Sequence, residues 1–219
     1  MSFSHEMRER TRHIWDASKT HPFLQQLVSS DLPHASFLYY LQQDAWFLRE
    51  EAKVMAIAAS RAPDLATSAR LCDLITTVND AEQGRHRTFA ERLGTPIDDT
   101  AFAPSPTAYA YVSHMRSVAL DGGLGPILAA LLPCPWLYRD FGKHFAGEAP
   151  SDPIYREWLA AYQSPLLDER VGYQCDLLDR TMAQADTPTR EDAARAFEIS
   201  IRYEHAFWDM AFARETWNA

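Results

Sequence analysis

The segment Phe37–Leu48, which reads FLYYLQQDAWFL, carries the clearest structural pattern in the chain. Its apolar and aromatic residues recur every three or four positions, which is the spacing of one face of an α-helix and not the alternation of a strand. The residues on that face are Phe37, Tyr40, Leu41, Asp44, Phe47 and Leu48. The segment therefore predicts a helix that buries an aromatic stripe with one carboxylate in it.

The same helical spacing extends outward over most of the 219 residues, which include only eight glycines. Turn signals rich in Pro, Gly and Asp separate the periodic segments, and several place Pro where a first helical turn would begin. The predicted helices cover 4–19, 33–61, 64–93, 105–120, 125–146, 153–163, 165–185 and 188–216. Strand-like alternation, a fixed-period repeat and a linker are all missing from the sequence, so we expect an all-α fold, with residues 1–219 forming a single-domain helical bundle.

The composition limits the kinds of partner. The chain has a net charge of -9 and no run of basic residues, which argues against binding to nucleic acid or to an anionic membrane surface. No segment approaches the roughly 18 consecutive apolar residues of a membrane span. Three cysteines without a CxxC motif, and an N-terminus without the apolar stretch of a signal peptide, predict reduced thiols in the cytoplasm.

Two carboxylates fall on apolar faces. Asp44 lies on the aromatic stripe, and Glu204 lies on the apolar face of the last predicted helix. A buried carboxyl tends to have a raised pKa and can then hold or pass a proton near neutral pH, as a general acid or base must. The alternatives are structural, because a neighbouring hydroxyl or amide could cap Asp44 and an arginine could pair with Glu204.

The segment Leu131–Trp136, LLPCPW, places one thiol between two prolines. Pro135 disfavours the α conformation at Cys134, so the preceding helix is expected to end or kink there. Cys134 would then be the N-cap of the next helix, where free N–H groups and the helix dipole favour the thiolate. Tyr138, one turn later, would stand beside the sulfur.

The other two cysteines predict core positions, and two pairs of side chains suggest a metal-binding alternative. Cys72 and Cys175 lie within helical patterns and are predicted to be small core residues. A di-metal oxidase remains an alternative, because two pairs of potential ligands have i,i+4 spacing. These pairs are Glu82 with His86 and His205 with Asp209. The sequence contains no Glu-x-x-His and no HExxH motif to strengthen that alternative.

Across nearly its whole length the chain resembles the TenA, or thiaminase II, family of the heme-oxygenase-like helical fold. The resemblance rests on many segments and on no single short motif. These segments are His21–Phe23, Tyr39–Asp44, Pro104–Met115, Ile127–Cys134, Pro153–Tyr162 and Tyr203–Ala211.

The resemblance implies an aminopyrimidine aminohydrolase that also splits thiamin, needs no metal or organic cofactor, and forms a homotetramer. It places the catalytic cysteine at Cys134, the proton-shuttling acid at Glu204, and the carboxylate that holds the aminopyrimidine edge at Asp44. The pocket tyrosines and the ring-stacking aromatic of the family fall on Tyr111, Tyr138, Tyr162 and Phe47. Many relatives have Tyr where this chain has Phe47, and an aromatic residue where it has Pro135, so its substrate preference is expected to differ.

The mechanistic hypothesis uses these residues together. The pyrimidine stacks on Phe47 and Tyr138, while Asp44 bridges a ring nitrogen and the exocyclic amine and makes the amine-bearing carbon electrophilic. Cys134 then adds, and Glu204 donates a proton to the departing amine and afterwards activates water. The second alternative is a non-catalytic pyrimidine-binding or regulatory protein, for which direct DNA binding is disfavoured by the acidic charge.

Overall fold

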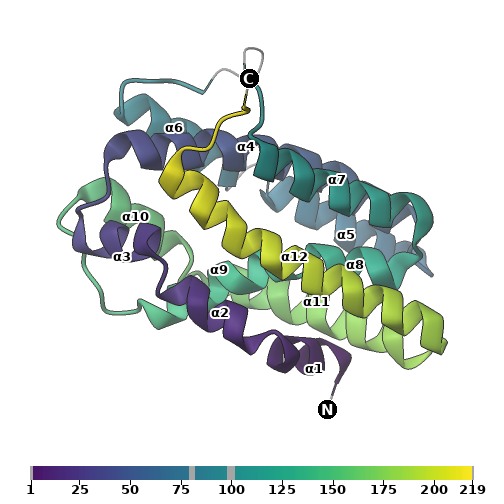
Figure 1. Ribbon diagram of the computed structural model, residues 1–219. Helices are drawn as coiled ribbons and strands as arrows, with labels where there is room; N and C mark the ends of the chain where they lie inside the picture. The colour runs from purple at the N-terminus through teal and green to yellow at the C-terminus, as the bar shows by residue number, and fades with distance from the viewer. Residues whose placement is uncertain (1, 79–81, 98–101, 219) are drawn as a thin grey trace.

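The computed structural model describes residues 2–78, 82–97 and 102–218, and every regular element in these ranges is a helix (Figure 1). The expected all-α fold is thus confirmed. The helices are α1 (Phe3–Arg10), α2 (Arg12–Lys19), α3 (Pro22–Ser29), α4 (His34–Ser60), α5 (Leu65–Val78), α6 (Gly84–Arg92), α7 (Pro106–Asp121), α8 (Leu124–Leu131), α9 (Pro133–His144), α10 (Pro153–Ala161), α11 (Pro165–Ala183) and α12 (Thr187–Ala213).

The long helix α12 organises the bundle. It runs diagonally across the molecule in Figure 1, with α4 and α7 along one side and α1, α2 and α11 along the other. It contacts α2, α3, α4, α7, α8 and α9 directly. Every side chain on the predicted apolar face of α4 is buried, as is the face of α12 that carries Glu204. The two longest helices therefore present their acidic residues to one shared core.

Proline and short polar side chains begin several helices, as the turn signals predict. α3, α7, α9, α10, α11 and α12 all have Pro in their first turn. Ser105, Asp152, Ser164 and Asp186 accept hydrogen bonds from the first free N–H groups of the helices that follow them. These caps satisfy donors that have no partner within the helix.

Some predicted helices are divided. The predicted helix 4–19 is α1 and α2, which are separated at Thr11, a residue whose hydroxyl bonds the carbonyl of Met7 and accepts from the indole of Trp15. The predicted helix 64–93 comprises α5 and α6, and residues 79–81 between them lie outside the described part. α3 is not among the predicted helices, because His and Pro at positions 21 and 22 are a turn signal. In the structure His21 caps a helix of eight residues that begins at Pro22.

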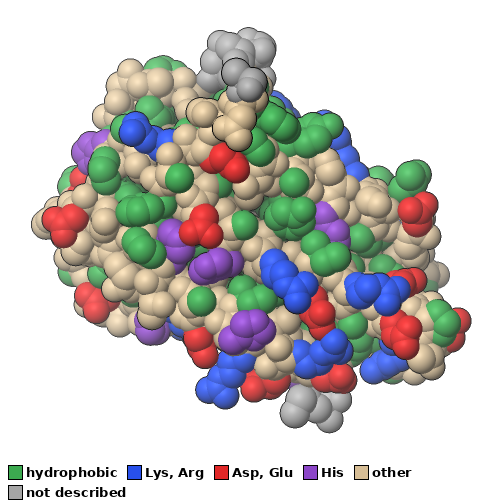
Figure 2. Space-filling view, viewed as in Figure 1, with side chains coloured by type: hydrophobic (Ala, Val, Ile, Leu, Met, Phe, Trp, Pro, Cys, Tyr) green, Lys and Arg blue, Asp and Glu red, His purple; other side chains and the backbone are tan. Residues whose placement is uncertain are grey.

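Within the described ranges, none of the helices is both long and apolar enough to cross a membrane. On the face shown in Figure 2, the Lys and Arg side chains are interspersed with Asp and Glu. This arrangement agrees with the acidic composition and offers no continuous basic surface on that face.

Candidate active site

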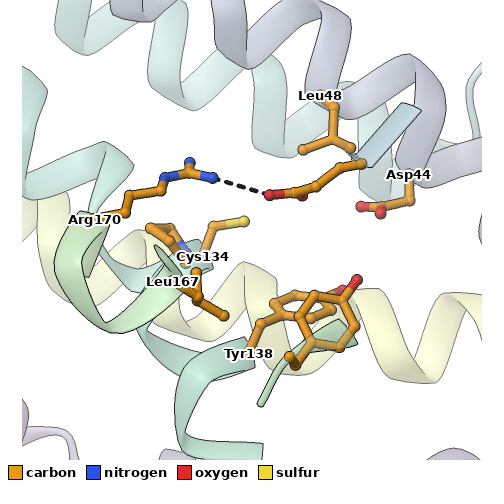
Figure 3. Close-up of a pocket in the computed structure, with 9 residues that line it drawn as sticks. Asp44, Leu48, Cys134, Tyr138, Leu167 and Arg170 are labelled. Atoms are coloured by element: carbon orange, nitrogen blue, oxygen red, sulfur yellow. Dashed lines mark hydrogen bonds and ion pairs between the residues drawn. The ribbon is translucent and has the colours of Figure 1, made fainter. Parts of the chain in front are cut away.

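A narrow cavity lies where α4, α9 and α11 meet, next to the start of α6 (Figure 3). It encloses about 280 Å³ of space that no atom fills. Its lining residues are Asp44, Leu48, Glu82, Cys134, Pro135, Tyr138, Tyr162, Leu167 and Arg170. The cavity therefore brings together four of the residues proposed from the sequence, namely Asp44, Cys134, Tyr138 and Tyr162.

Asp44 is buried in the wall of the cavity, and two side chains of the described residues contact its Oδ2 oxygen. Tyr40 donates to Oδ2 of Asp44 at 3.2 Å, and Nε2 of His86 lies 3.1 Å from the same oxygen. A hydroxyl cap was the structural alternative for this carboxylate, and Tyr40 supplies it. The other carboxylate oxygen, Oδ1, takes no part in these two contacts.

Glu204 is buried on α12, and its partner is a tyrosine and not an arginine. Tyr111 of α7 donates a hydrogen bond of 2.7 Å to Oε1 of Glu204. Burial raises the pKa of Glu204 to about 8, the nearby Asp44 and Glu51 add to this, and hydrogen bonds from Tyr111 and Cys134 oppose it. Glu204 is not among the residues that line the cavity, and it lies close enough to the Cys134 thiol for each group to shift the pKa of the other.

Cys134 is not the N-cap that its flanking prolines predict. α9 begins at Pro133, and Leu132 before it already has helical angles, with φ -67° and ψ -36°. The N–H of Trp136 bonds the carbonyl of Leu132 at 3.3 Å, so Cys134 lies inside the first turn. Helical geometry is tolerated here because the prolines occupy first-turn positions, where an N–H would have no partner within the helix. Pro133 and Pro135 supply no N–H, which leaves Cys134 with few of the free donors that an N-cap would meet.

The electrostatic surroundings of Cys134 also correct the prediction of a stabilised thiolate. The side chain is 7% exposed, and burial raises the pKa of the thiol well above its ordinary value. The carboxylates of Glu204, Glu51, Asp44 and Glu82 raise it further. The resting sulfur is therefore a thiol, and it needs a base to become a nucleophile.

Aromatic side chains form the remaining walls. The hydroxyl groups of Tyr40 and Tyr138 are 3.1 Å apart, and the rings of Tyr138 and Tyr162 are 4.8 Å apart. Phe47 does not line the cavity but packs against Tyr111, with ring centroids 4.8 Å apart. In this structure Phe47 supports the donor to Glu204, and its role in stacking the substrate stays a prediction.

A buried ionic group that sequence reasoning missed completes the site. Arg170 is 6% exposed, and its Nη1 lies 3.0 Å from Oε1 of Glu82, the ion pair drawn as a dashed line in Figure 3. Its Nη2 lies 3.7 Å from Oε1 of Glu51, a residue whose pKa burial raises to about 7. Glu51 lies one turn beyond Leu48 and two turns beyond Asp44, so helical spacing could have identified it.

The residues of the di-metal alternative are engaged in separate places. Glu82 pairs with Arg170 and His86 with Asp44. His205 contacts the hydroxyl of Ser18, and Asp209 contacts His21, both toward the N-terminal helices. Among the described residues, no three His, Cys, Asp or Glu side chains form a group that could hold a metal ion. The two pairs thus do not come together as the alternative required.

The remaining cysteines differ from each other. Cys175 is buried on α11, as predicted, and burial raises its pKa to about 12. Cys72 is exposed on α5, so the prediction that it is a core residue was wrong. Its helix is amphipathic, and the core-facing positions are held by Leu71 and Leu74.

Fold and site together define an all-helical protein with a buried thiol, a buried acid and an aromatic cavity. Comparison with known proteins narrows this class. Residues 8–214 match the model of the TENA/THI-4/PQQC family, and the chain belongs to that family. It is 38% identical, over 100% of its length and 93% of the relative, to a Bacillus subtilis (strain 168) protein named aminopyrimidine aminohydrolase.

Solved structures agree with this assignment. A TenA homologue from P. horikoshii OT3 superimposes with a TM-score of 0.88 at 26% identity, covering 97% of this chain and 99% of that one. A Shewanella denitrificans OS217 domain described as having a heme oxygenase-like fold gives a TM-score of 0.73 at 13% identity, covering 96% of this chain and 92% of that one. The resemblance to TenA proteins and the heme-oxygenase-like fold are both confirmed.

Proposed function

We propose that this chain hydrolyses 4-amino-5-aminomethyl-2-methylpyrimidine to the hydroxymethylpyrimidine and ammonia, and cleaves thiamin at the same site. The observation that carries the proposal is a cavity lined by both Cys134 and Asp44, with the buried Glu204 close enough to the thiol for each group to shift the pKa of the other. The name of the 38% identical relative, aminopyrimidine aminohydrolase, supports the same class of substrate.

Asp44 recognises the edge of the pyrimidine. Because Tyr40 and His86 both contact Oδ2, they fix the orientation of the carboxylate, and Oδ1 is the oxygen that we assign to the ligand. The exocyclic amine donates to a carboxylate oxygen, and the adjacent ring nitrogen does so when it carries a proton. Tyr138 and Tyr162 offer aromatic faces beside this edge, and Phe47 and Tyr111 complete the proposed substrate-binding set.

Glu204 is the base that makes Cys134 reactive. Burial and the surrounding carboxylates keep the thiol protonated, and Glu204, with a pKa of about 8, is the acid whose charge raises the pKa of the thiol most. In its ionised form Glu204 accepts the thiol proton. Its pKa lies near working pH, which suits both the acceptance and the later donation of a proton.

The bond that breaks joins the methylene carbon to the amine, because the product carries a hydroxymethyl group in the same place. The sulfur is therefore proposed to attack the unsubstituted ring carbon, which is bonded to the ring carbon that bears the methylene group. This replaces the attack on the amine-bearing ring carbon that the sequence-based hypothesis proposed. The new C–S bond pushes a ring electron pair toward the methylene, and Glu204 returns its proton to the amine, which leaves as ammonia. An exocyclic methylene group remains on the ring.

Water completes the reaction. Glu204, now a carboxylate, takes a proton from water as its oxygen bonds to the methylene carbon. The ring electron pair then expels the sulfur, which recovers its proton from Glu204, so the enzyme returns to its starting state. With thiamin, the thiazole leaves from the same methylene carbon in place of ammonia. These steps use only side chains of the chain itself.

The test compares purified wild-type protein with Cys134→Ser and Glu204→Gln variants in an assay of ammonia release from the aminomethylpyrimidine. We expect turnover by the wild type and losses of at least about a hundredfold in each variant, since general acid-base catalysis alone contributes that much. Cys72→Ser is the matched control and should keep full activity. Undiminished activity in Cys134→Ser would sink the covalent mechanism, and tight pyrimidine binding without turnover would favour the non-catalytic binder.

The resemblance also supports assembly as a homotetramer, and the three free cysteines support a cytoplasmic location. Light scattering on the purified protein tests the first, with a mass near four times 24.9 kDa expected. Fractionation of cells that produce the full chain tests the second. A monomer in solution, or recovery of the protein outside the cytoplasmic fraction, would contradict the corresponding proposal.

A further inference from the structure

A second cavity adjoins the catalytic cavity. It encloses about 520 Å³ and lies between the start of α6, the end of α10 and the start of α11. Its lining residues are Thr77, Glu82, Arg85, Ala161, Tyr162, Ser164, Leu166, Leu167 and Arg170. Four of these, Glu82, Tyr162, Leu167 and Arg170, line the catalytic cavity as well. The two spaces are therefore separated by one shared wall of four side chains.

We propose that the outer cavity receives the leaving group of large substrates, and that the Glu82–Arg170 ion pair, with Leu167, sets how readily such substrates are used. This inference rests on the proposed function and names a specificity determinant for it. The ion pair and Leu167 limit how large the departing group can be, and they take no part in the bond-breaking steps.

The size of the catalytic cavity carries the first step of the argument. The unfilled space at the outer cavity, about 520 Å³, is larger than the space at the catalytic cavity, about 280 Å³. In the proposed function the pyrimidine ring and a small amine belong at the catalytic cavity, which Cys134 and Asp44 line. A substrate that carries a second heterocycle on its methylene carbon needs more room, and the outer cavity supplies it on the far side of the shared wall.

The chemistry of the shared wall carries the second step. Arg170 and Glu82 come from different parts of the chain, and Nη1 of Arg170 lies 3.0 Å from Oε1 of Glu82. Opening the wall separates the buried Arg170 guanidinium from the Glu82 carboxylate, whose side chain is 18% exposed, and this costs free energy unless the ligand replaces the contact. An intact pair therefore favours departure of a small amine and opposes departure of a bulky group.

The character of the outer cavity fits a heterocyclic leaving group. Tyr162, Leu166 and Leu167 offer aromatic and aliphatic surface, and the carboxylate of Glu82 faces the same space. Arg85 and Arg170 line the same space, so its charged lining is one acidic and two basic side chains and does not favour a cation. A thiazolium ring becomes a neutral thiazole when it leaves the methylene carbon, and a neutral heterocycle packs well on aromatic and aliphatic surface.

The experiment measures kcat/KM for thiamin cleavage and for aminomethylpyrimidine deamination in the same preparations. The test variant is Glu82→Ala/Arg170→Leu, which removes both charges together. Glu51, whose pKa is about 7, can then be neutralised by taking up a proton. The matched control is Arg70→Ala/Glu169→Ala, an exposed ion pair of 2.7 Å that also involves α11 but lies outside both cavities. We expect the thiamin-to-aminopyrimidine ratio to rise at least tenfold in the test variant and to stay within twofold in the control.

Leu167 provides a test that does not disturb buried charge. Leu167→Ala should raise the same ratio and Leu167→Trp should lower it, because they widen and fill the shared wall. If the wild type deaminates the aminopyrimidine and the ratio is unchanged in all these variants, the leaving-group inference is overturned while the proposed function stands. If the wild type converts neither compound, both are overturned.

Discussion

Tyr111 and Glu204 are 93 positions apart in the sequence, yet the phenol hydroxyl lies 2.7 Å from the carboxylate oxygen and both groups are buried. A hydroxyl that donates to a carboxylate stabilises its ionised form and so opposes the effect of burial on its pKa. In the proposed mechanism, this bond increases the share of Glu204 that is ionised and able to accept the thiol proton near neutral pH.

Tyr111→Phe should therefore raise the pKa of Glu204 above 8 and move the rising limb of kcat/KM to higher pH. Because a hydrogen bond to a charged group is worth about 1.5–3 kcal/mol, activity at pH 7 should fall by roughly ten- to a hundredfold and recover in part at alkaline pH. Full pH–rate profiles measure this shift. Tyr109→Phe, two residues away and half exposed, is the control. An unshifted limb in Tyr111→Phe would show that the bond does not tune the acid.

The three thiols should react at very different rates with iodoacetamide at pH 7, which mass spectrometry of the labelled peptides can follow. Exposed Cys72 should be alkylated first. Cys134 and Cys175 should react slowly in the native protein, because burial raises the pKa of both thiols and the reagent attacks the thiolate. In urea all three should react at similar rates. Native Cys134 that reacts as fast as Cys72 would contradict the raised pKa.

His21 caps α3 through a ring nitrogen, since Nδ1 accepts from the N–H of Phe23 at 3.1 Å while Nε2 lies 3.0 Å from Asp209. His21→Ala should cost about 1 kcal/mol of unfolding free energy, the usual value of a lost cap. Urea unfolding at pH 7.5 measures this cost. His21→Asn, which can accept the same hydrogen bond, should be less destabilised.

The burial of His21 also makes the free energy of unfolding depend on pH. Burial lowers the pKa of His21 below 6.5, although Asp209 opposes this, so the folded state binds fewer protons than the unfolded state. The stabilisation is present above pH 6.5 and is lost as the pH falls toward the folded-state pKa. Between pH 7.5 and 5.5, His21→Asn should lose less unfolding free energy than the wild type. Parallel losses in the two proteins would rule out His21 as a source of the pH dependence.

Gly142 permits close packing between α9 and the end of α10. A Cβ at this position would lie 2.1 Å from the carbonyl oxygen of Tyr162 and 2.5 Å from its carbon, and backbone cannot move aside easily. Gly142→Ala should cost about 1–3 kcal/mol and displace Tyr162 from the cavity wall, with reduced activity. Gly172→Ala, with open space around it on α11, should instead gain up to about 1 kcal/mol. Thermal unfolding and the ammonia assay check both variants.

The sequence predicts the burial of Asp44 and Glu204 well because each lies on a long helix with strong periodicity, and that signal is local. The start of α9 was predicted wrongly because the rule for residues before proline describes an isolated dipeptide. Here Leu132 is already helical and both prolines fall in the first turn.

The thiol pKa and the Arg170 ion pairs could not be predicted from local sequence. Arg170 lies on α11, Glu51 lies on α4 and Glu82 immediately precedes α6, so only their packing reveals that they meet. The direction of the pKa shift at Cys134 likewise depends on burial and on carboxylates that several elements supply. A helix-dipole argument based on the neighbouring residues alone predicts a lowered thiol pKa, which is the opposite direction.

The position of Glu204 near the end of the chain affects when the site can form. A ribosome makes α4, α7 and α9 long before α12, so the newly made thiol of Cys134 waits without its proton acceptor for about 70 residues of synthesis, roughly 4–14 seconds at 5–20 residues per second. During that interval the incomplete chain holds the thiol without the acid that the proposed mechanism pairs with it. In that mechanism, docking of the last helix is the event that completes the catalytic pair.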